Sequence, residues 1–147
     1  MAVLYYLLSF GFVVYGFFRL LGAGLLLALT SGRWGGEELP PEVLTQLQDG
    51  VAKVEGFLAA HPGTLLIDLS LPGYFGYSAL MGAVLFIGGV LSLLKKTSGW
   101  FLIALYHILF ALMFLNYGAL NAKLLHLAVS FGLFLMLVLL GRKRLRH

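Results

Sequence analysis

Residues 100–140 read WFLIALYHILFALMFLNYGALNAKLLHLAVSFGLFLMLVLL, and this stretch decides the fold. Its main polar interruption is a short turn that contains Asn116, Gly118, Asn121 and Lys123. A bilayer core about 30 Å thick is crossed by about 20 apolar residues in a helix. Residues 100–117 and 120–140 are therefore predicted to be two transmembrane helices that form a tight antiparallel hairpin.

Two further apolar runs precede this hairpin, at residues 3–30 and 74–94, and neither contains proline. Hydrophobic residues make up 61% of the 147-residue chain and charged residues 11%. Soluble domains have about 45–50% and about 25% of these residues, so the surplus apolar surface must face lipid or a partner. The sequence predicts one all-α membrane domain over residues 1–147, with four transmembrane helices in a bundle. The first run is too long for the apolar region of a signal peptide and lacks a preceding basic segment, so we expect it to be retained.

Basic residues near the helix ends predict the orientation of the chain in the membrane. Lys95 and Lys96 end the second run, and the fourth run is followed by Arg142, Lys143, Arg144 and Arg146. In a four-span protein both groups lie on one side, which is expected to be the cytoplasmic side. Both termini are then cytoplasmic, with residues 141–147 as a basic tail. We expect a bacterial inner membrane, with an organellar membrane as the alternative.

The long loop at residues 31–73 holds all six acidic residues and is expected to lie on the outer face. Pro40-Pro41-Glu42 is typical of a helix start, and His61-Pro62-Gly63 of a helix end. Between them, apolar residues recur with one-sided helical spacing. The loop is therefore predicted to contain an amphipathic helix that lies on the membrane or caps the bundle.

Arg19 is the one charged residue inside the first apolar run. An arginine in a transmembrane helix is costly and indicates a functional or structural role. If the span ends near Ala23, Arg19 lies about 6 Å below the outer interface. Three interpretations remain open: a side chain that snorkels to that interface, an ion pair with Asp68 that clamps the outer loop, and a contact to a substrate.

His107 and His126 lie in the third and fourth runs. Two intramembrane histidines could ligate a haem, but neighbouring antiparallel helices pack about 8–10 Å apart, too close for a macrocycle between facing imidazoles. The alternatives are a neutral imidazole hydrogen bonded to Tyr106, Ser130 or a backbone carbonyl, and a contact to a quinone. Together with Arg19, these histidines are the candidate contacts for a quinone or another cofactor.

Small residues in the second and fourth runs are predicted to be helix-packing positions, because lipid offers helices no hydrophobic drive to associate. These positions are Gly82, Gly88, Gly89, Ala128 and Gly132. The chain has no cysteine, HExxH, P-loop or GxSxG motif, and no metal site is predicted. These absences favour a function other than catalysis.

The stretch Gly16-Phe17-Phe18-Arg19-Leu20 resembles the G-x-x-[KR]-L signature at the end of the first helix in DoxX-like membrane proteins. The order of one helix, a long amphipathic outer segment and three closely spaced helices is also similar. The resemblance implies a four-helix bundle associated with quinone-linked redox systems or acting as an accessory component. Many members carry an acidic residue in a G-x-x-E run of the second helix, whereas this chain reads Gly82-Ala83-Val84-Leu85.

Plentiful apolar and small residues, with few catalytic groups, favour a non-catalytic accessory subunit of a larger membrane complex. The expected partners are the lipid bilayer and other membrane-protein subunits, and not nucleic acid, because the basic residues are explained by topology. The alternative function is a redox-linked protein that binds quinone or haem in the bundle. A further alternative is an assembly factor for other membrane proteins.

Overall fold

The computed structural model of the protein describes residues 2–118 and 123–145. These residues form the helices α1 (Ala2–Thr30), α2 (Pro41–Ala60), α3 (Leu71–Leu93), α4 (Ser98–Tyr117) and α5 (Lys123–Leu145). The helices α1, α3 and α4, and Lys123–Lys143 of α5, are each long and apolar enough to cross a membrane. The protein is therefore an all-helical, multi-pass membrane protein, as the sequence predicted.

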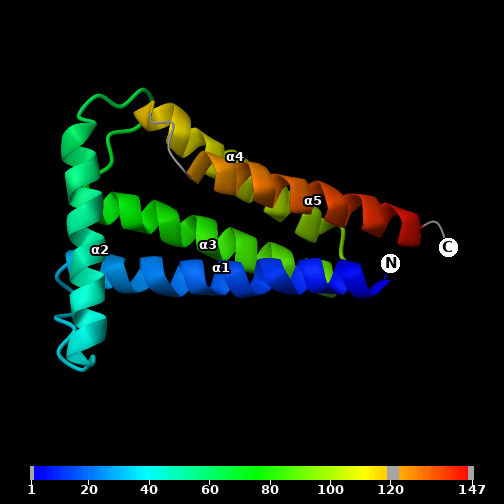
Figure 1. The fold of residues 1–147 in the computed structure, drawn as a ribbon, viewed down its shortest axis with the longest axis horizontal. Helices are drawn as coiled ribbons and strands as arrows, with labels where there is room; N and C mark the ends of the chain where they lie inside the picture. The colour runs from blue at the N-terminus through cyan, green and yellow to red at the C-terminus, as the bar shows by residue number, and fades with distance from the viewer. Residues whose placement is uncertain (1, 119–122, 146–147) are drawn as a thin grey trace.

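The four apolar helices α1, α3, α4 and α5 run side by side, and α2 lies across one end of them (Figure 1). Both chain termini lie at the opposite end, where the turn between α3 and α4 holds Lys95 and Lys96. We call these the α2 end and the terminal end of the bundle. The basic groups that predicted the topology therefore gather at one end, although Arg146 lies outside the described residues.

Helix boundaries agree with the sequence to within a few residues. The helix α3 begins three residues before the predicted start, because the Ser70 hydroxyl accepts a hydrogen bond from the Gly73 amide (3.2 Å) and caps the first turn. Gly118 follows the last residue of α4 and ends this helix by adopting the left-handed conformation (φ 58°). Residues 141–145 continue α5 and do not begin a separate tail, and the predicted start of the fourth span at 120 lies outside the described residues.

The helices α1 and α3 approach each other so closely that their backbones touch. A Cβ atom on Gly82 would lie 2.5 Å from the Leu20 amide nitrogen, and one on Gly89 would lie 2.7 Å from that of Val13. On α1, Gly16 is equally crowded by α3. Only glycine permits this separation, so these residues lock α1 against α3.

The contact between α3 and α4 also depends on glycines at positions where the two helices are in close contact. A Cβ on Gly99 would lie 2.6 Å from the carbonyl oxygen of Gly88, and one on Gly88 would lie 3.0 Å from the Ile103 side chain. In addition, the Tyr77 hydroxyl donates a hydrogen bond to the Leu109 carbonyl oxygen (2.7 Å). The three predicted packing positions on α3 are therefore at helix interfaces.

The helix α5 packs less closely. Its buried residues are Ser130, Phe134, Leu137 and Gly141. Ala128 and Gly132, which were also predicted to be packing positions, are exposed, and a Cβ on Gly132 would have no neighbour within 4 Å. That prediction is wrong within this chain, because these residues lie on the face of α5 that is turned away from the other helices.

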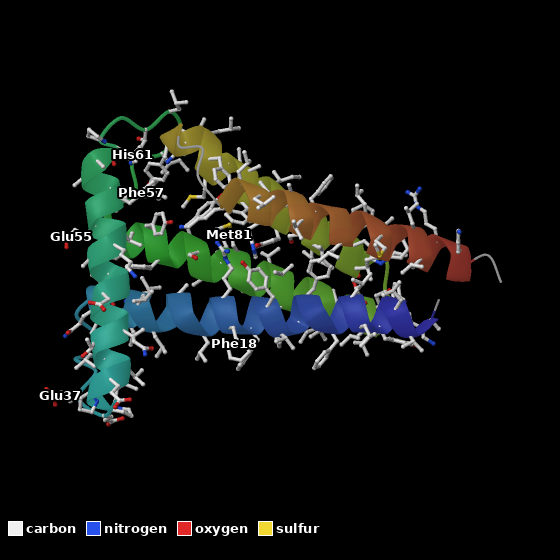
Figure 2. The ribbon with its side chains drawn as sticks, in the orientation of Figure 1. Phe18, Glu37, Glu55, Phe57, His61 and Met81 are labelled. Carbon is white, nitrogen blue, oxygen red and sulfur yellow. The ribbon has the colours of Figure 1, made fainter. Side chains whose placement is uncertain are left out.

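The helix α2 is the predicted amphipathic helix. None of its residues is buried, and Figure 2 shows Glu37, before its start, and Glu55 pointing away from the bundle. On its other side, the Phe57 ring packs against Tyr117 at a centroid distance of 5.1 Å. The helix therefore caps the bundle with an apolar face and keeps its acidic groups outside.

Asn116, near the end of α4, holds the connection between α2 and α3. Its Oδ1 accepts hydrogen bonds from the amides of Leu66 (2.9 Å) and Ile67 (2.8 Å), and its Nδ2 donates to the Ile67 carbonyl oxygen (2.9 Å). Its backbone carbonyl oxygen accepts a further hydrogen bond from the Leu65 amide (2.9 Å). A single buried side chain thus satisfies three backbone groups of an otherwise irregular segment.

Candidate functional site

A cavity of about 590 Å³ lies between the helices and is partly open to the outside, and residues from all five helices line it. Figure 1 shows that the α1–α3 pair and the α4–α5 pair diverge toward the α2 end. Phe57 of α2 borders the cavity at that end, and Met81 of α3 borders it deeper in the bundle (Figure 2). Most of the wall is apolar or aromatic, so the few polar groups in it identify the candidate site.

Arg19 is the central polar group of this wall. Its Nη1 donates a hydrogen bond to the Tyr15 hydroxyl (3.3 Å), and its Nη2 lies 3.9 Å from the Met81 sulfur. The guanidinium carbon lies 4.9 Å from the ring centroid of Phe110 and 5.7 Å from that of Tyr106, which are cation–π distances. Its Nε is buried and, among the described residues, has no hydrogen-bond partner. The cation is therefore held by aromatic faces and one hydroxyl, with donor capacity left over.

The depth of Arg19 differs from the sequence-based expectation. The helix α1 continues to Thr30, about 16 Å beyond Arg19 at the helical rise. Side chains in a helix tilt toward its N-terminus, so Arg19 is directed away from the α2 end and toward Tyr15, one turn earlier. Arg19 therefore does not snorkel to the nearer interface but reaches across the bundle to α3 and α4.

The structure does not bring Arg19 and Asp68 together as an ion pair. Asp68 is exposed in the connection between α2 and α3, whereas the contacts of the Arg19 guanidinium are Tyr15, Met81, Tyr106 and Phe110. The ion pair was expected to hold the outer loop in place. Asn116 has this role instead, because it binds the segment between α2 and α3 to α4. A neutral amide serves this position well, since it can donate and accept at once and carries no charge that has to be desolvated.

Tyr15 connects Arg19 to the second candidate, His126. The Tyr15 oxygen accepts from Arg19, so its proton can be donated to Nε2 of His126, 2.9 Å away. All three residues line the cavity. A chain of hydrogen bonds thus crosses from α1 to α5 along the cavity wall.

His107 has a structural role and does not line this cavity. Its Nδ1 donates to the Ile103 carbonyl oxygen (2.7 Å), which leaves Nε2 to accept from the Ser130 hydroxyl (3.0 Å). Both nitrogens are in use, and the ring is buried between α4 and α5. His107 is therefore the hydrogen-bonded neutral imidazole that the sequence offered as one interpretation, and it is not a contact of the cavity.

Around Arg19 the site combines a guanidinium with a phenol and an imidazole, in a wall that is mostly apolar or aromatic. Within residues 2–118 and 123–145, no group of three or more metal-ligating side chains occurs. Such a wall provides hydrogen-bond donors and positive charge, which suit the binding of a polar head on an apolar molecule. Nucleophilic or metal-dependent chemistry has no corresponding arrangement among the described lining residues.

Sequence reasoning missed the residues that hold Arg19. Tyr15 precedes it by one helical turn, and this i, i+4 spacing was the available signal. Met81, Tyr106 and Phe110 come from other helices, and only the tertiary arrangement could identify them. Comparison of the chain with protein-family models, with curated proteins and with solved structures finds no match.

Proposed function

We propose that the protein binds one amphipathic, lipid-like molecule inside its transmembrane bundle and performs no chemistry on it. The observation that carries this proposal is the cavity in which Arg19, Tyr15 and His126 converge within a mostly apolar or aromatic wall. Its volume of about 590 Å³ falls within the range of about 300–1,000 Å³ that is common for small-molecule sites.

A quinone, the ligand class that the resemblance to DoxX-like proteins implies, fits such a site in outline. Its carbonyl oxygens can accept hydrogen bonds from Arg19 and Tyr15, and its ring can pack on Phe110. A haem ligated by His107 and His126 does not fit. Both nitrogens of His107 are hydrogen bonded within the bundle, and His107 does not line the cavity.

A matched pair of variants tests the proposal. Gly22 lines the cavity and Gly24 lines neither described cavity, and a Cβ at either position would have no neighbour within 4 Å. Gly22→Phe should therefore place a ring in the cavity, while Gly24→Phe adds the same ring to the same helix elsewhere. We expect solvent extraction and chromatography to recover a bound molecule from the wild type and from Gly24→Phe, and not from Gly22→Phe. Equal recovery from all three proteins would contradict the proposal.

We also propose that the terminal end faces the cytoplasm of a bacterial cell, with an organellar membrane as the alternative location. The support is the group of basic residues at that end, where both termini lie. The chain has no cysteine, so Ser31→Cys and Ser98→Cys each introduce a single thiol at an exposed position. In intact cells an impermeant thiol reagent should label the first variant and not the second. The reverse pattern would invert the orientation.

A second candidate function, an accessory subunit, is favoured by the outer face of α5. Ala128 and Gly132 are exposed there, and small residues on a lipid-facing helix allow another helix to approach closely. Gentle purification from native membrane should then recover a larger complex, and Gly132→Leu should release the chain from it. Recovery of a lone monomer would contradict this function, and a partner that is retained only transiently would indicate an assembly factor instead.

A further inference from the structure

We propose that the molecule in the cavity is a lipid anion, with a phosphate or carboxylate head group beside Arg19 and an apolar chain between α1 and α5. This inference rests on the proposed function, because it names the class of molecule that the same cavity binds. It is carried by the charge of the cavity wall, the free donor capacity of Arg19 and the position of a second, adjoining cavity.

The charge of the wall favours an anion. Arg19 lines the cavity, and none of the described lining residues is acidic. Charged side chains at membrane depth are normally paired with one another or with backbone groups. The described residues provide Arg19 with aromatic faces and a hydroxyl, but with no carboxylate. A ligand that carries a negative charge would complete this environment.

The donor geometry also favours an anion with more than one oxygen. Nε of Arg19 is buried and has no hydrogen-bond partner among the described residues, and Nη1 makes only one long hydrogen bond, 3.3 Å, to Tyr15. Guanidinium groups bind phosphate and carboxylate through two parallel N–H donors. A neutral carbonyl would use one of these donors and leave the positive charge uncompensated.

A second cavity provides space for the apolar chain. It has a volume of about 230 Å³, lies between α1 and α5, and shares Tyr15 and His126 with the first cavity. Its remaining lining residues are Leu7, Leu8, Gly11, Phe12, Val129, Ser130 and Leu133. A Cβ on Gly11 would have no neighbour within 4 Å, so the missing side chain contributes to this space.

The two cavities follow each other along the axis of the bundle. The larger cavity begins under α2, at Phe57, and the smaller one adjoins it at Tyr15 and reaches Leu7, about 12 Å further toward the terminal end at the helical rise. Arg19 lies about 16 Å from the α2 end of α1, near the middle of that helix. The head group of the proposed ligand would therefore lie deep in the bundle, and its chain would extend from there toward the terminal end.

Binding measurements on the full chain in a neutral detergent test the inference. Native mass spectrometry gives the bound fraction for lysophosphatidylglycerol, palmitate, monopalmitoylglycerol, a short-chain quinone and inorganic phosphate. We expect the two chain-bearing anions to bind about tenfold or more tightly than the neutral monopalmitoylglycerol, the size of a charge-assisted hydrogen-bond effect. Inorganic phosphate should bind weakly, because it has no chain to fill the second cavity.

Two pairs of variants assign the head and the chain separately. Arg19→Gln should abolish the preference for anions, whereas Arg33→Gln, at an exposed arginine before α2, should keep it. Gly11→Leu should weaken binding of both chain-bearing anions, whereas Gly24→Leu should not. Should Arg19→Gln fail to fold, Arg19→Lys keeps the charge, lacks the paired donors, and should reduce the preference.

Several results would overturn the inference. They are equal binding of lysophosphatidylglycerol and monopalmitoylglycerol by the wild type, or the same preference in Arg19→Gln as in Arg33→Gln. Tight binding of the quinone alone would also overturn it and would leave the proposed function standing. If none of the chain-bearing compounds bound, the proposed function would fail as well.

Discussion

The helix α1 packs closely against α3 and loosely against α5. Against α3 its backbone is in direct contact, because Gly16, Gly82 and Gly89 leave no room for a Cβ. Against α5 it leaves a cavity of about 230 Å³, and Gly11 on this side has no neighbour within 4 Å of an added Cβ. Glycine therefore allows close contact at the α1–α3 interface and leaves open space at the α1–α5 interface.

The close α1–α3 interface has a structural role, and the loose α1–α5 interface provides space for the candidate site. The α1–α3 contact fixes the backbone on which Arg19 stands, since the carbonyl carbon of Arg19 would lie 3.0 Å from a Cβ on Gly82. The looser side, between α1 and α5, holds the space into which Tyr15 and His126 project. Precise placement of a cation and room for a ligand are thus provided by different faces of one helix.

The largest expected effect comes from breaking the close interface. Gly82→Leu would drive α1 away from α3, and we expect it to destabilise the protein by about 3 kcal/mol or more, at or above the usual cost of overpacking. Unfolding of the purified protein in mixed micelles, followed by circular dichroism, measures the change. Gly132→Leu adds the same side chain on the open face of α5 and should leave stability unchanged; equal losses in both variants would abolish the distinction between the two faces.

A smaller effect is expected at Asn116, which holds the connection between α2 and α3. Asn116→Ala would leave the amides of Leu66 and Ile67 without their acceptor, at a cost of about 2 kcal/mol. Hydrogen exchange at these two amides should accelerate while exchange within α3 stays slow. Gln48→Ala, at an exposed position of α2, is the control. Unchanged exchange at Leu66 and Ile67 would show that Asn116 does not hold the connection.

The smallest effect should come from the open side, where α5 is attached by few polar contacts. Ser130→Ala removes the donor to Nε2 of His107 and should cost about 1 kcal/mol, typical of one hydrogen bond between membrane helices. A double-mutant cycle with His107→Phe should give a coupling of similar size. Strictly additive effects of the two substitutions would indicate that this hydrogen bond does not join α4 to α5.

Much of this architecture could be predicted from the sequence, because hydropathy and helix signals are local. The four spans and the helix Pro41–Ala60 follow from apolar runs and from proline at a helix start. Arg19 was identified for the same reason, since a charge in an apolar run is visible without any tertiary information.

The partners of Arg19 could not be predicted, because they depend on how the helices are rotated. The sequence offered an ion pair with Asp68 as one of three interpretations, whereas the side chain lies among Tyr15, Met81, Tyr106 and Phe110. The same limitation applies to the small residues. Gly82 and Gly132 are both glycines in apolar helices, yet only the arrangement in space distinguishes the crowded one from the open one.

The central claim is that Arg19 meets a lipid anion inside the bundle, and its own side-chain signal tests this most directly. The chain contains five arginines, so a ¹⁵N–¹H spectrum of their Nε–H groups has few signals, and Arg19→Gln assigns the one of interest. On addition of lysophosphatidylglycerol, we expect the Arg19 signal to shift, and the neutral monopalmitoylglycerol at the same concentration should leave it unmoved. An Arg19 signal that does not shift when the anion is added, or that shifts only together with the exposed Arg33 signal, would contradict the account.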